Sequence, residues 1–271
     1  MSMFINTNVG AINAHRNLGM NNTAMGKTME KLSSGFRINR AADDAAGLAI
    51  SEKMRFQIGG MNQAMRNAQD GISLIQTAEG ALTEVHSMLQ RLNTLANQTA
   101  TGTYDDKDRA NTQKEVDALL AEIDNIAKST NFNGIKLLSA AGNVTFQIGV
   151  DKGNTLTAKL AAMGTKALGL ENLKISSQAN ASAALAKIAS AINLVSTQRA
   201  AFGAVQNRLE HTINNLGVTA ENLSASESRI RNADMAKEMT DFTRNQILVQ
   251  AGTAMLAQAN SAPQSVLKLL G

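Results

Sequence analysis

The sequence has no cysteine, no tryptophan and a single proline, Pro263, in 271 residues. The lack of cysteine excludes disulfide bonds, thiol catalysis and cysteine-ligated metal sites. Average usage would place about thirteen prolines in a chain of this length. Because proline interrupts helices, its near absence permits very long ones. Aromatic residues make up only 3% of the chain, so small and aliphatic side chains must build the core, as suits closely packed helices.

The chain also lacks a strong charge of one sign and any long apolar run. The net charge is +4, the pI is near 9.4, and the basic residues are dispersed, which favours surface solvation over nucleic-acid binding. Without a stretch of about twenty apolar residues, we expect no transmembrane span. The opening residues, MSMFINTN, have neither the basic head nor the apolar stretch of a secretory signal peptide. We therefore expect any export to use a route without a cleaved signal.

Clusters of chemically active residues are missing as well. The three histidines, His15, His86 and His211, are far apart, and no metal-binding spacing groups them. The glycines show no phosphate-binding pattern. Asp43 and Asp44 are better explained as caps at a helix start than as a catalytic pair. The sequence therefore predicts no enzyme activity, no metal and no cofactor.

The sequence does contain a long heptad pattern. Alternate steps of three and four residues from Leu185 give fourteen positions, eleven of them apolar: Leu185, Ile188, Ile192, Val195, Arg199, Phe202, Gln206, Leu209, Ile213, Leu216, Ala220, Leu223, Glu227 and Ile230. A repeat averaging 3.5 residues indicates a helix packed lengthwise against other helices. At 1.5 Å per residue this helix would be roughly 70 Å long. It therefore needs a partner of similar length.

Other helices follow from apolar periodicity and from residues that start or stop helices. We expect helices over about 8–34, 44–99 and 106–129, a fourth from about 182 that bends near Gly217, and an apolar series beyond 230. The first helix has a modest apolar face, which suits packing among copies. The apolar tail after Pro263 is either a frayed terminus or a segment buried against another subunit. Gly59 and Gly60 are a weak point of the second helix, at about 1 kcal/mol each.

The middle of the chain changes character. Asn133-Gly134 is a tight-turn dipeptide, and residues 143–148 and 155–160 alternate apolar and polar side chains, as half-buried strands do. Residues 161–180 show little pattern and are expected to be irregular. The fold class is thus mainly α, a long antiparallel coiled-coil-like rod of helices with a small β-hairpin element.

Several segments resemble the signatures of bacterial flagellins. They read SSGFRIN at 33–39, ADDAAG at 42–47, RNAQDGIS at 66–73, TAEGAL at 77–82, ESRIRNAD at 227–234, QIL at 246–248, QAGT at 250–253 and LAQAN at 256–260. The resemblance implies an extracellular structural subunit that polymerises into the flagellar filament for swimming motility. It also implies export through the flagellar type III channel.

The resemblance implies a domain organisation. Residues 1–42 and 233–271 would form a terminal domain of paired helices in the filament core, and residues 43–232 would form a rod domain with a β element at about 132–160. The middle is too short for the separate outer domain of larger flagellins. Asn232 stands where many relatives have aspartate, which puts an ion pair at that position in doubt.

The resemblance also implies partners and site residues. The partners are other copies of the chain, an export chaperone at the C-terminal segment, the filament cap and hook-junction proteins, and the vertebrate Toll-like flagellin receptor. The receptor surface would comprise Gln90, Arg91, Leu95 and Glu115. The assembly and linker residues would be Ser34, Gly35, Arg37, Ile38, Asn39, Asp43, Asp44, Arg229, Ile230, Arg231 and Asp234.

Spacing alone permits other interpretations. Arg91 can be a solvated helix residue, and Leu95 can lie partly in the helical seam. For the whole chain, the closest rival is a hook–filament junction protein, which also polymerises. A helical adaptor that does not polymerise is a second class, and it predicts stable terminal helices in a monomer. An enzyme would need a convergent polar constellation that the sequence does not offer.

Overall fold

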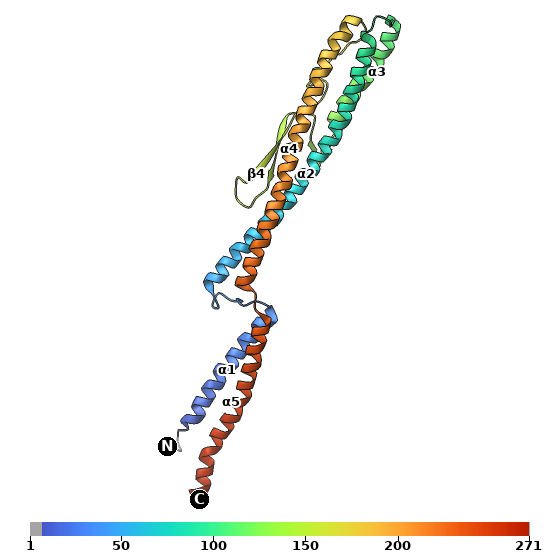
Figure 1. The fold of residues 1–271 in the computed structure, drawn as a ribbon. Helices are drawn as coiled ribbons and strands as arrows, with labels where there is room; N and C mark the ends of the chain where they lie inside the picture. Colours follow the sequence, from blue (N-terminus) through green and yellow to red (C-terminus); the bar gives the residue numbers. More distant parts are fainter. Residues whose placement is uncertain (1–6, 271) are drawn as a thin grey trace. The chain divides into compact units, whose positions relative to one another are not determined.

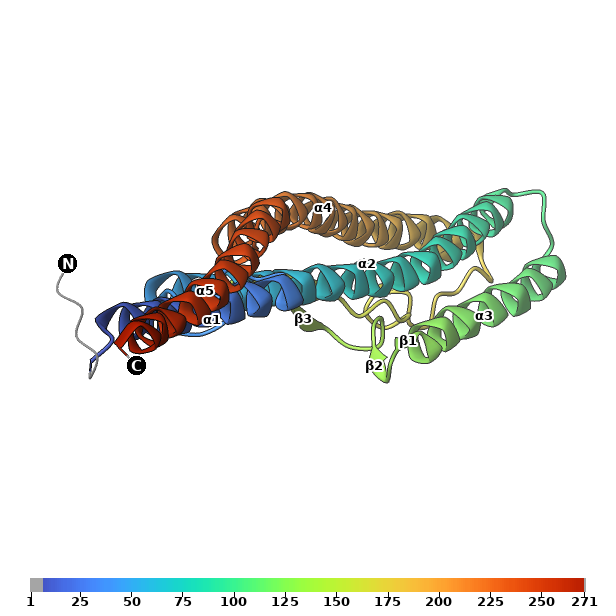
Figure 2. The ribbon, with the colours of Figure 1, turned by 90° about the horizontal axis from the view of Figure 1, so that it is seen from below.

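The computed structural model describes the backbone of residues 7–270 and the side chains of residues 7–261. Its elements, labelled across Figures 1 and 2, are α1 (Val9–Ser34), α2 (Ala45–Ala100), α3 (Asp106–Ser129), β1 (Asn131–Phe132), β2 (Ile135–Lys136), β3 (Gly142–Gln147), β4 (Thr155–Leu160), α4 (Gln178–Arg231) and α5 (Met235–Leu270). They form two compact units, here called the terminal unit (residues 1–56 and 222–271) and the rod unit (residues 57–221). The mainly α fold expected from the sequence is confirmed.

The rod unit is built on antiparallel helices. Figures 1 and 2 show α2 running beside both α4 and α3. Glu79 of α2 lies 3.5 Å from Arg199 of α4, and Arg91 of α2 lies 2.7 Å from Glu115 of α3. Between the helices, α2 buries a continuous series of apolar side chains that includes Ile75, Ala78, Leu82, Val85, Leu89 and Leu92. The long helix predicted by the heptads therefore has its long partner within the same chain.

The buried seam of α4 differs in part from the expected one. Its buried residues are Ala181, Ala184, Ile188, Ala191, Val195, Gln198, Phe202, Leu209 and Ala220. Five positions of the expected seam are fully buried: Ile188, Val195, Phe202, Leu209 and Ala220. Leu185, Ile192 and Ile213 are half-buried against the core, and Ala184, Ala191 and Gln198 are buried although the heptad pattern did not include them. Alanine lets neighbouring backbone approach closely, and the Gln198 amide donates 2.8 Å to the Lys159 carbonyl. At Gly217, where a bend was expected, α4 continues as one unbroken helix.

The β element packs on this helical core. Strands β3 and β4 pair antiparallel, with Gly142 opposite Leu160, and β4 buries alternate residues along its length. A smaller hairpin, β1–β2, turns at Asn133 and Gly134, which have positive φ angles of 48° and 82°. The β3–β4 hairpin was predicted from alternation, and the turn at Asn133 and Gly134 was predicted from its dipeptide. Within the described residues these are the two sheets, each of two strands.

The segment between β4 and α4 has no helix or strand, as expected, but it is not a loose connection. Its apolar side chains enter the core at Met163, Leu168, Leu170, Leu173 and Ile175. The Gln113 side chain of α3 bonds both the Leu173 carbonyl and the Ile175 amide, at 3.0 and 2.7 Å. The irregular segment therefore completes the core of the rod unit.

The far end of α2 is closed by a buried arginine that the sequence did not reveal. Arg109 of α3 is 8% exposed. Its Nε donates 3.2 Å to the Thr99 carbonyl and its Nη2 donates 2.9 Å to the Thr101 carbonyl. Because the last carbonyls of a helix have no partner within it, a guanidinium suits this position.

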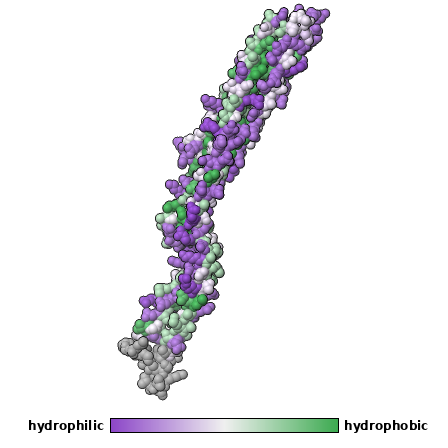
Figure 3. Space-filling model, in the orientation of Figure 1, coloured by the Kyte–Doolittle hydropathy of each residue, from purple (hydrophilic) through white to green (hydrophobic). Residues whose placement is uncertain are grey.

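The terminal unit is much less well packed. Its helices α1 and α5 are antiparallel, since the Asn8 amide donates 2.6 Å to the Ala259 carbonyl and Lys31 pairs with Glu238 at 3.3 Å. Among its described side chains, Ile38 is the one large apolar residue that is fully buried. Figure 3 shows apolar side chains at the surface of these helices. The apolar tail after Pro263, for which burial against another subunit was one expectation, lies outside the residues whose side chains are described.

Candidate functional site

The linker joint, defined here as residues 34–44 and 229–234, connects the terminal helices to α2 and α4 within the terminal unit. Its two segments pair through an isolated antiparallel bridge between Phe36 and Asn232. The Arg37 amide donates 2.7 Å to the Arg231 carbonyl, and the Ala233 amide donates 2.9 Å to the Gly35 carbonyl. The two segments are thus one hydrogen-bonded structure.

Gly35 makes the turn out of α1 possible. Its φ of 74° is left-handed, a conformation that favours glycine. Its amide donates 2.8 Å to the Lys31 carbonyl, which closes the last turn of the helix. Ser34 supports the same turn, because its hydroxyl oxygen accepts the Phe36 amide at 3.1 Å.

The buried Ile38 side chain packs in the joint beside Gly47, which has no side chain to displace it. The Ile38 side chain is 1% exposed. A Cβ atom at Gly47 would lie 2.9 Å from the Ile38 Cδ1 and 2.4 Å from the Asp44 Oδ2. Asp44 caps α2 as predicted, since its Oδ1 accepts the Gly47 amide at 2.8 Å. Any side chain at Gly47 would therefore disturb both the anchor and the cap.

Asp43 holds the linker turn instead of capping α2, so the predicted capping role is wrong for this residue. Its Oδ2 accepts the backbone amides of Arg40 and Asn39, at 3.0 and 3.2 Å. These bonds favour the ionised carboxylate and lower the pKa of Asp43 below its ordinary value, with the Arg40 amide as the largest cause. The Asn39 side chain in turn donates 3.3 Å to the Phe36 carbonyl.

A charged cluster lies over the bridge. The Arg231 guanidinium stacks 5.0 Å from the centre of the Phe36 ring and pairs with Glu52 of α2. Glu52 also lies 3.7 Å from Arg55, which lies 3.8 Å from Glu227. The sequence pointed to Arg231 but not to Phe36 or Glu52 as its partners, because Glu52 is 179 positions away, Phe36 is further still, and such distant residues carry no local signal.

The other predicted linker residues have separate roles. The Ile230 carbonyl accepts the Arg37 guanidinium at 2.5 Å. Asp234 caps α5, since its Oδ1 accepts the amides of Ala236 and Lys237 at 3.0 and 3.2 Å. Arg229 donates only within its own helix, to the Ser226 hydroxyl at 3.0 Å. All but Arg229 thus contribute to the joint or to a helix end beside it.

The predicted receptor surface lies in the rod unit, where α2 meets α3. Arg91 bonds Glu115 through both Nε and Nη2, at 2.8 and 2.7 Å, and both side chains are about half exposed. The exposed Gln90 contacts the His86 ring at 3.0 Å. Leu95, in contrast, is 2% exposed and packs in the core. The accessible part of this surface is therefore Gln90, Arg91 and Glu115.

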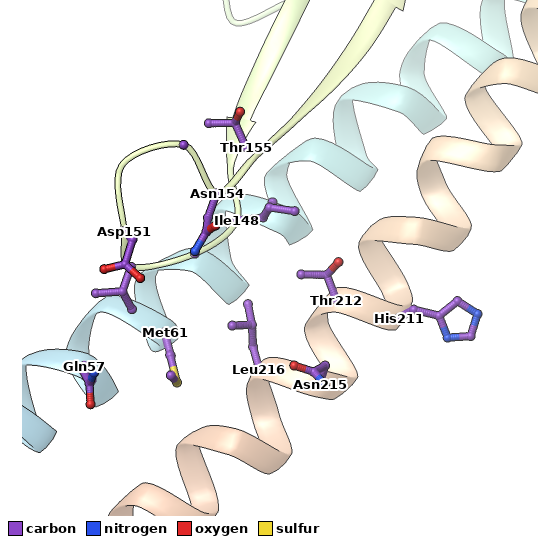
Figure 4. A pocket seen from close by; sticks show the side chains of 13 residues that line it. Gln57, Met61, Ile148, Asp151, Asn154, Thr155, His211, Thr212, Asn215 and Leu216 are labelled. Carbon is purple, nitrogen blue, oxygen red and sulfur yellow. The ribbon is translucent and has the colours of Figure 1, made fainter.

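The rod unit also contains an open cavity of about 550 Å³ between the β3–β4 turn and helices α2 and α4. Figure 4 shows that Met61 and Leu216 line it beside turn residues, while the His211 ring points away. The described side chains form no group of three or more His, Asp or Glu that could hold a metal ion.

Among the described residues, none of the helices combines the length and hydropathy that a membrane crossing requires.

Two family models match the chain. The bacterial flagellin N-terminal helical region matches residues 5–143, and the bacterial flagellin C-terminal helical region matches residues 185–270. Together they cover the whole linker joint and both ends of the rod unit, leaving residues 144–184 unmatched.

Curated relatives are similar to the chain over almost its whole length. Flagellin of Bacillus subtilis (strain 168) is 51% identical, with 99% of this chain and 100% of that protein covered. Flagellin of Halalkalibacterium halodurans is 54% identical, with the same coverage. The flagellar filament 33 kDa core protein of Treponema phagedenis is 50% identical, again over 99% and 100% of the two chains.

Solved structures agree in fold. The crystal structure of Bacillus cereus flagellin has a TM-score of 0.52 and 35% identity, and the match covers 60% of this chain and 94% of that one. A putative flagellar hook-associated protein from Vibrio parahaemolyticus has a TM-score of 0.60, covering 70% and 100% of the two chains. At 14% identity, the second likeness concerns the fold alone.

Proposed function

The chain belongs to the bacterial flagellin family and is a structural subunit of the flagellar filament; we propose that it assembles through its terminal unit, outside the cell, to serve swimming motility. In this proposal residues 1–42 and 233–271 pair in the filament core. Residues 43–232 form the rod domain around that core, and no separate outer domain is inserted between its β element and α4.

The exposed apolar surface of the terminal unit supports this proposal best. Of the fourteen large apolar side chains that are exposed in the described part of the chain, eleven lie in this unit. On α1 and α5 they are Val9, Ile12, Met20, Met29, Met235, Met239, Ile247, Leu248 and Met255. Large exposed apolar surfaces mark interaction sites. Copies of the same surface, packed together, would supply the core that this unit lacks.

The remaining partners are proposals that follow from family membership. The chain would be exported through the flagellar type III channel without a cleaved signal peptide. An export chaperone would hold the C-terminal segment, whose exposed apolar residues on α5 would otherwise associate too early. The filament cap and hook-junction proteins would contact the assembled subunits.

Recognition by the Toll-like flagellin receptor is a further proposal. It rests on Arg91 and Glu115, which are paired and half exposed on the rod unit. An arginine that keeps free donors can bind carboxylates or carbonyls of a partner. Leu95 would act indirectly, by holding α2 in place from the core.

Assembly from purified subunits tests the main proposal. The full chain, seeded with sonicated filaments or concentrated with ammonium sulfate, is expected to form filaments visible by electron microscopy. Ile247→Glu should prevent growth, because it places a charge on an apolar surface that assembly would bury. Its neighbour Gln246, also exposed, provides the matched control: Gln246→Glu adds the same charge and should assemble.

Truncation separates the proposal from its rivals. Removing residues 234–271 should abolish filaments while circular dichroism still reports a folded rod unit. A helical adaptor would instead remain monomeric as the full chain under every seeding condition. A hook–filament junction protein would form short rings or caps on filament ends, without extending them.

A further inference from the structure

Methionine exposure is divided sharply between the two units. The five exposed methionines are Met20, Met29, Met235, Met239 and Met255. Their exposed fractions lie between 48% and 63%, and all five belong to α1 or α5. The other methionines whose side chains are described, Met25, Met54, Met61, Met65, Met88 and Met163, are half-buried or buried. The thioethers open to solvent thus lie on the surface proposed to assemble.

Two of the exposed methionines share one groove. A cavity of about 280 Å³ lies between α1 and α5, and both Met20 and Met255 line it together with the apolar Leu18 and Leu248. The two helices are closely packed at the groove, since a Cβ atom at Gly252 would lie 3.3 Å from the Leu18 Cδ1. A side chain that enters this groove would therefore lie beside both Met20 and Met255.

Hydrogen peroxide converts such a thioether to a sulfoxide. The methionine sulfur attacks one peroxide oxygen, the O–O bond breaks, and that oxygen stays on sulfur while the other leaves as water. Sulfur is oxidised by two electrons and the peroxide is reduced by two. The product is polar and chiral, and methionine sulfoxide reductases return it to the thioether.

We propose that Met20 and Met255 form a peroxide-sensitive modification site that controls whether a subunit can join the filament. This inference rests on the proposed assembly through α1 and α5. A sulfoxide oxygen at the side of the groove needs hydrogen bonds from water, and a second copy packed on the groove would remove that water without replacing it. Oxidised subunits are therefore excluded from growing filaments, and reduction readmits them.

Partitioning of a partly oxidised sample tests the proposal without any substitution. Full-length protein is treated with a limiting amount of hydrogen peroxide, which is then quenched, and the sample is seeded. Filaments are separated from free subunits by sedimentation, and peptide mass spectrometry gives the sulfoxide at each methionine in both fractions. Sulfoxide at Met20 and Met255 should be depleted about fivefold or more in the filaments. Sulfoxide at Met61 and Met65, in the rod unit, should be distributed equally.

Variants provide the second arm. Met20→Leu with Met255→Leu keeps the apolar volume and should assemble after a peroxide dose that stops the wild type. Met61→Leu with Met65→Leu is the matched control and should remain sensitive. Methionine sulfoxide reductase should restore assembly to the oxidised wild type.

The outcomes separate failure of the modification site from failure of the proposed assembly function. Equal sulfoxide in filaments and free subunits at Met20 and Met255 would overturn the modification site, as would peroxide sensitivity of the Met20/Met255 variant equal to that of the wild type. If untreated wild-type protein forms no filaments at all, the assembly proposal itself fails, whatever the oxidation pattern.

Discussion

The guanidinium of Arg231 lies 5.0 Å from the centre of the Phe36 ring, so the two segments of the linker joint are held by stacking as well as by backbone hydrogen bonds. An arginine over an aromatic face contributes about 0.5–2 kcal/mol, more when desolvated. The Arg231 side chain is only 14% exposed, and it also pairs with Glu52. Each contact restrains the position of α5 relative to α2 within the terminal unit.

Replacing Arg231 should therefore loosen the joint. In Arg231→Leu, the amides of Arg37 and Ala233, which donate across the joint, should exchange with solvent about tenfold faster, as expected for a loss near 1.4 kcal/mol. Hydrogen exchange followed by mass spectrometry measures this. Arg229→Leu is the control, because Arg229 is exposed and bonds only Ser226. Equal exchange in both variants would show that the stacking contributes nothing.

The Asp43 carboxylate should titrate below the ordinary aspartate range. The amides of Arg40 and Asn39 bond its ionised form, so its folded pKa is lower than its unfolded pKa. Its stabilising effect is thus present above the ordinary aspartate pKa and is lost as the pH falls through the lowered folded value. NMR titration of the carboxyl carbon in the folded chain and in urea should show this difference. A midpoint that is the same in both states would contradict the hydrogen bonds.

The neighbouring glycines of α2 should respond oppositely to alanine. Nothing lies within 4 Å of a Cβ atom at Gly59, so Gly59→Ala should stabilise the rod unit by about 1 kcal/mol through helix propensity. A Cβ atom at Gly60 would lie 2.9 Å from the Val150 Cγ2 of the β3–β4 turn. Gly60→Ala should thus lose that gain or become destabilising. Denaturant unfolding of the two variants compares them directly, and equal stabilisation would mean that the turn does not pack on α2.

Loss of the Arg91 side chain should weaken receptor signalling and leave the fold intact. Since the Arg91–Glu115 pair is half exposed, Arg91→Ala should change the free energy of unfolding by no more than about 1 kcal/mol. In reporter cells that carry the flagellin receptor, the variant should need a concentration about tenfold higher, or more, for half-maximal signalling. Arg66→Ala, on the same helix, is the control, because Arg66 is exposed and bonds only Gln63. Wild-type signalling by Arg91→Ala would rule out the assignment.

Local signals predicted the elements well. The ends of α1 follow from Asn8 and Gly35, whose cap geometries are local, and the hairpin at Asn133–Gly134 follows from a dipeptide. The seam of α4 was predicted only in part. The heptad pattern did not include the buried residues Ala184, Ala191 and Gln198. Their burial depends on how closely another segment approaches and not on their hydropathy.

Contacts between distant segments were beyond prediction from one sequence. Arg109 caps α2 from the next helix, and nothing around it marks a buried arginine. Leu95 was assigned to a surface by its position in a motif, yet its side chain faces the core. The partners of Arg231 are likewise brought together only by folding. A motif indicated which residues matter in the linker joint, while their contacts required the structure.

The buried residues of the irregular segment determine where a foreign peptide can be displayed. An insertion within residues 163–175 would pull core side chains such as Leu170 and Ile175 out of the rod unit. The β3–β4 turn has the opposite character: Asp151, Lys152 and Gly153 are exposed, and the Gln147 amide already holds the turn by donating to the carbonyls of Gly149 and Asp151 at 2.8 and 2.9 Å. An epitope grafted between Lys152 and Gly153 would be carried by every subunit, at the surface of the rod unit, without entering its core.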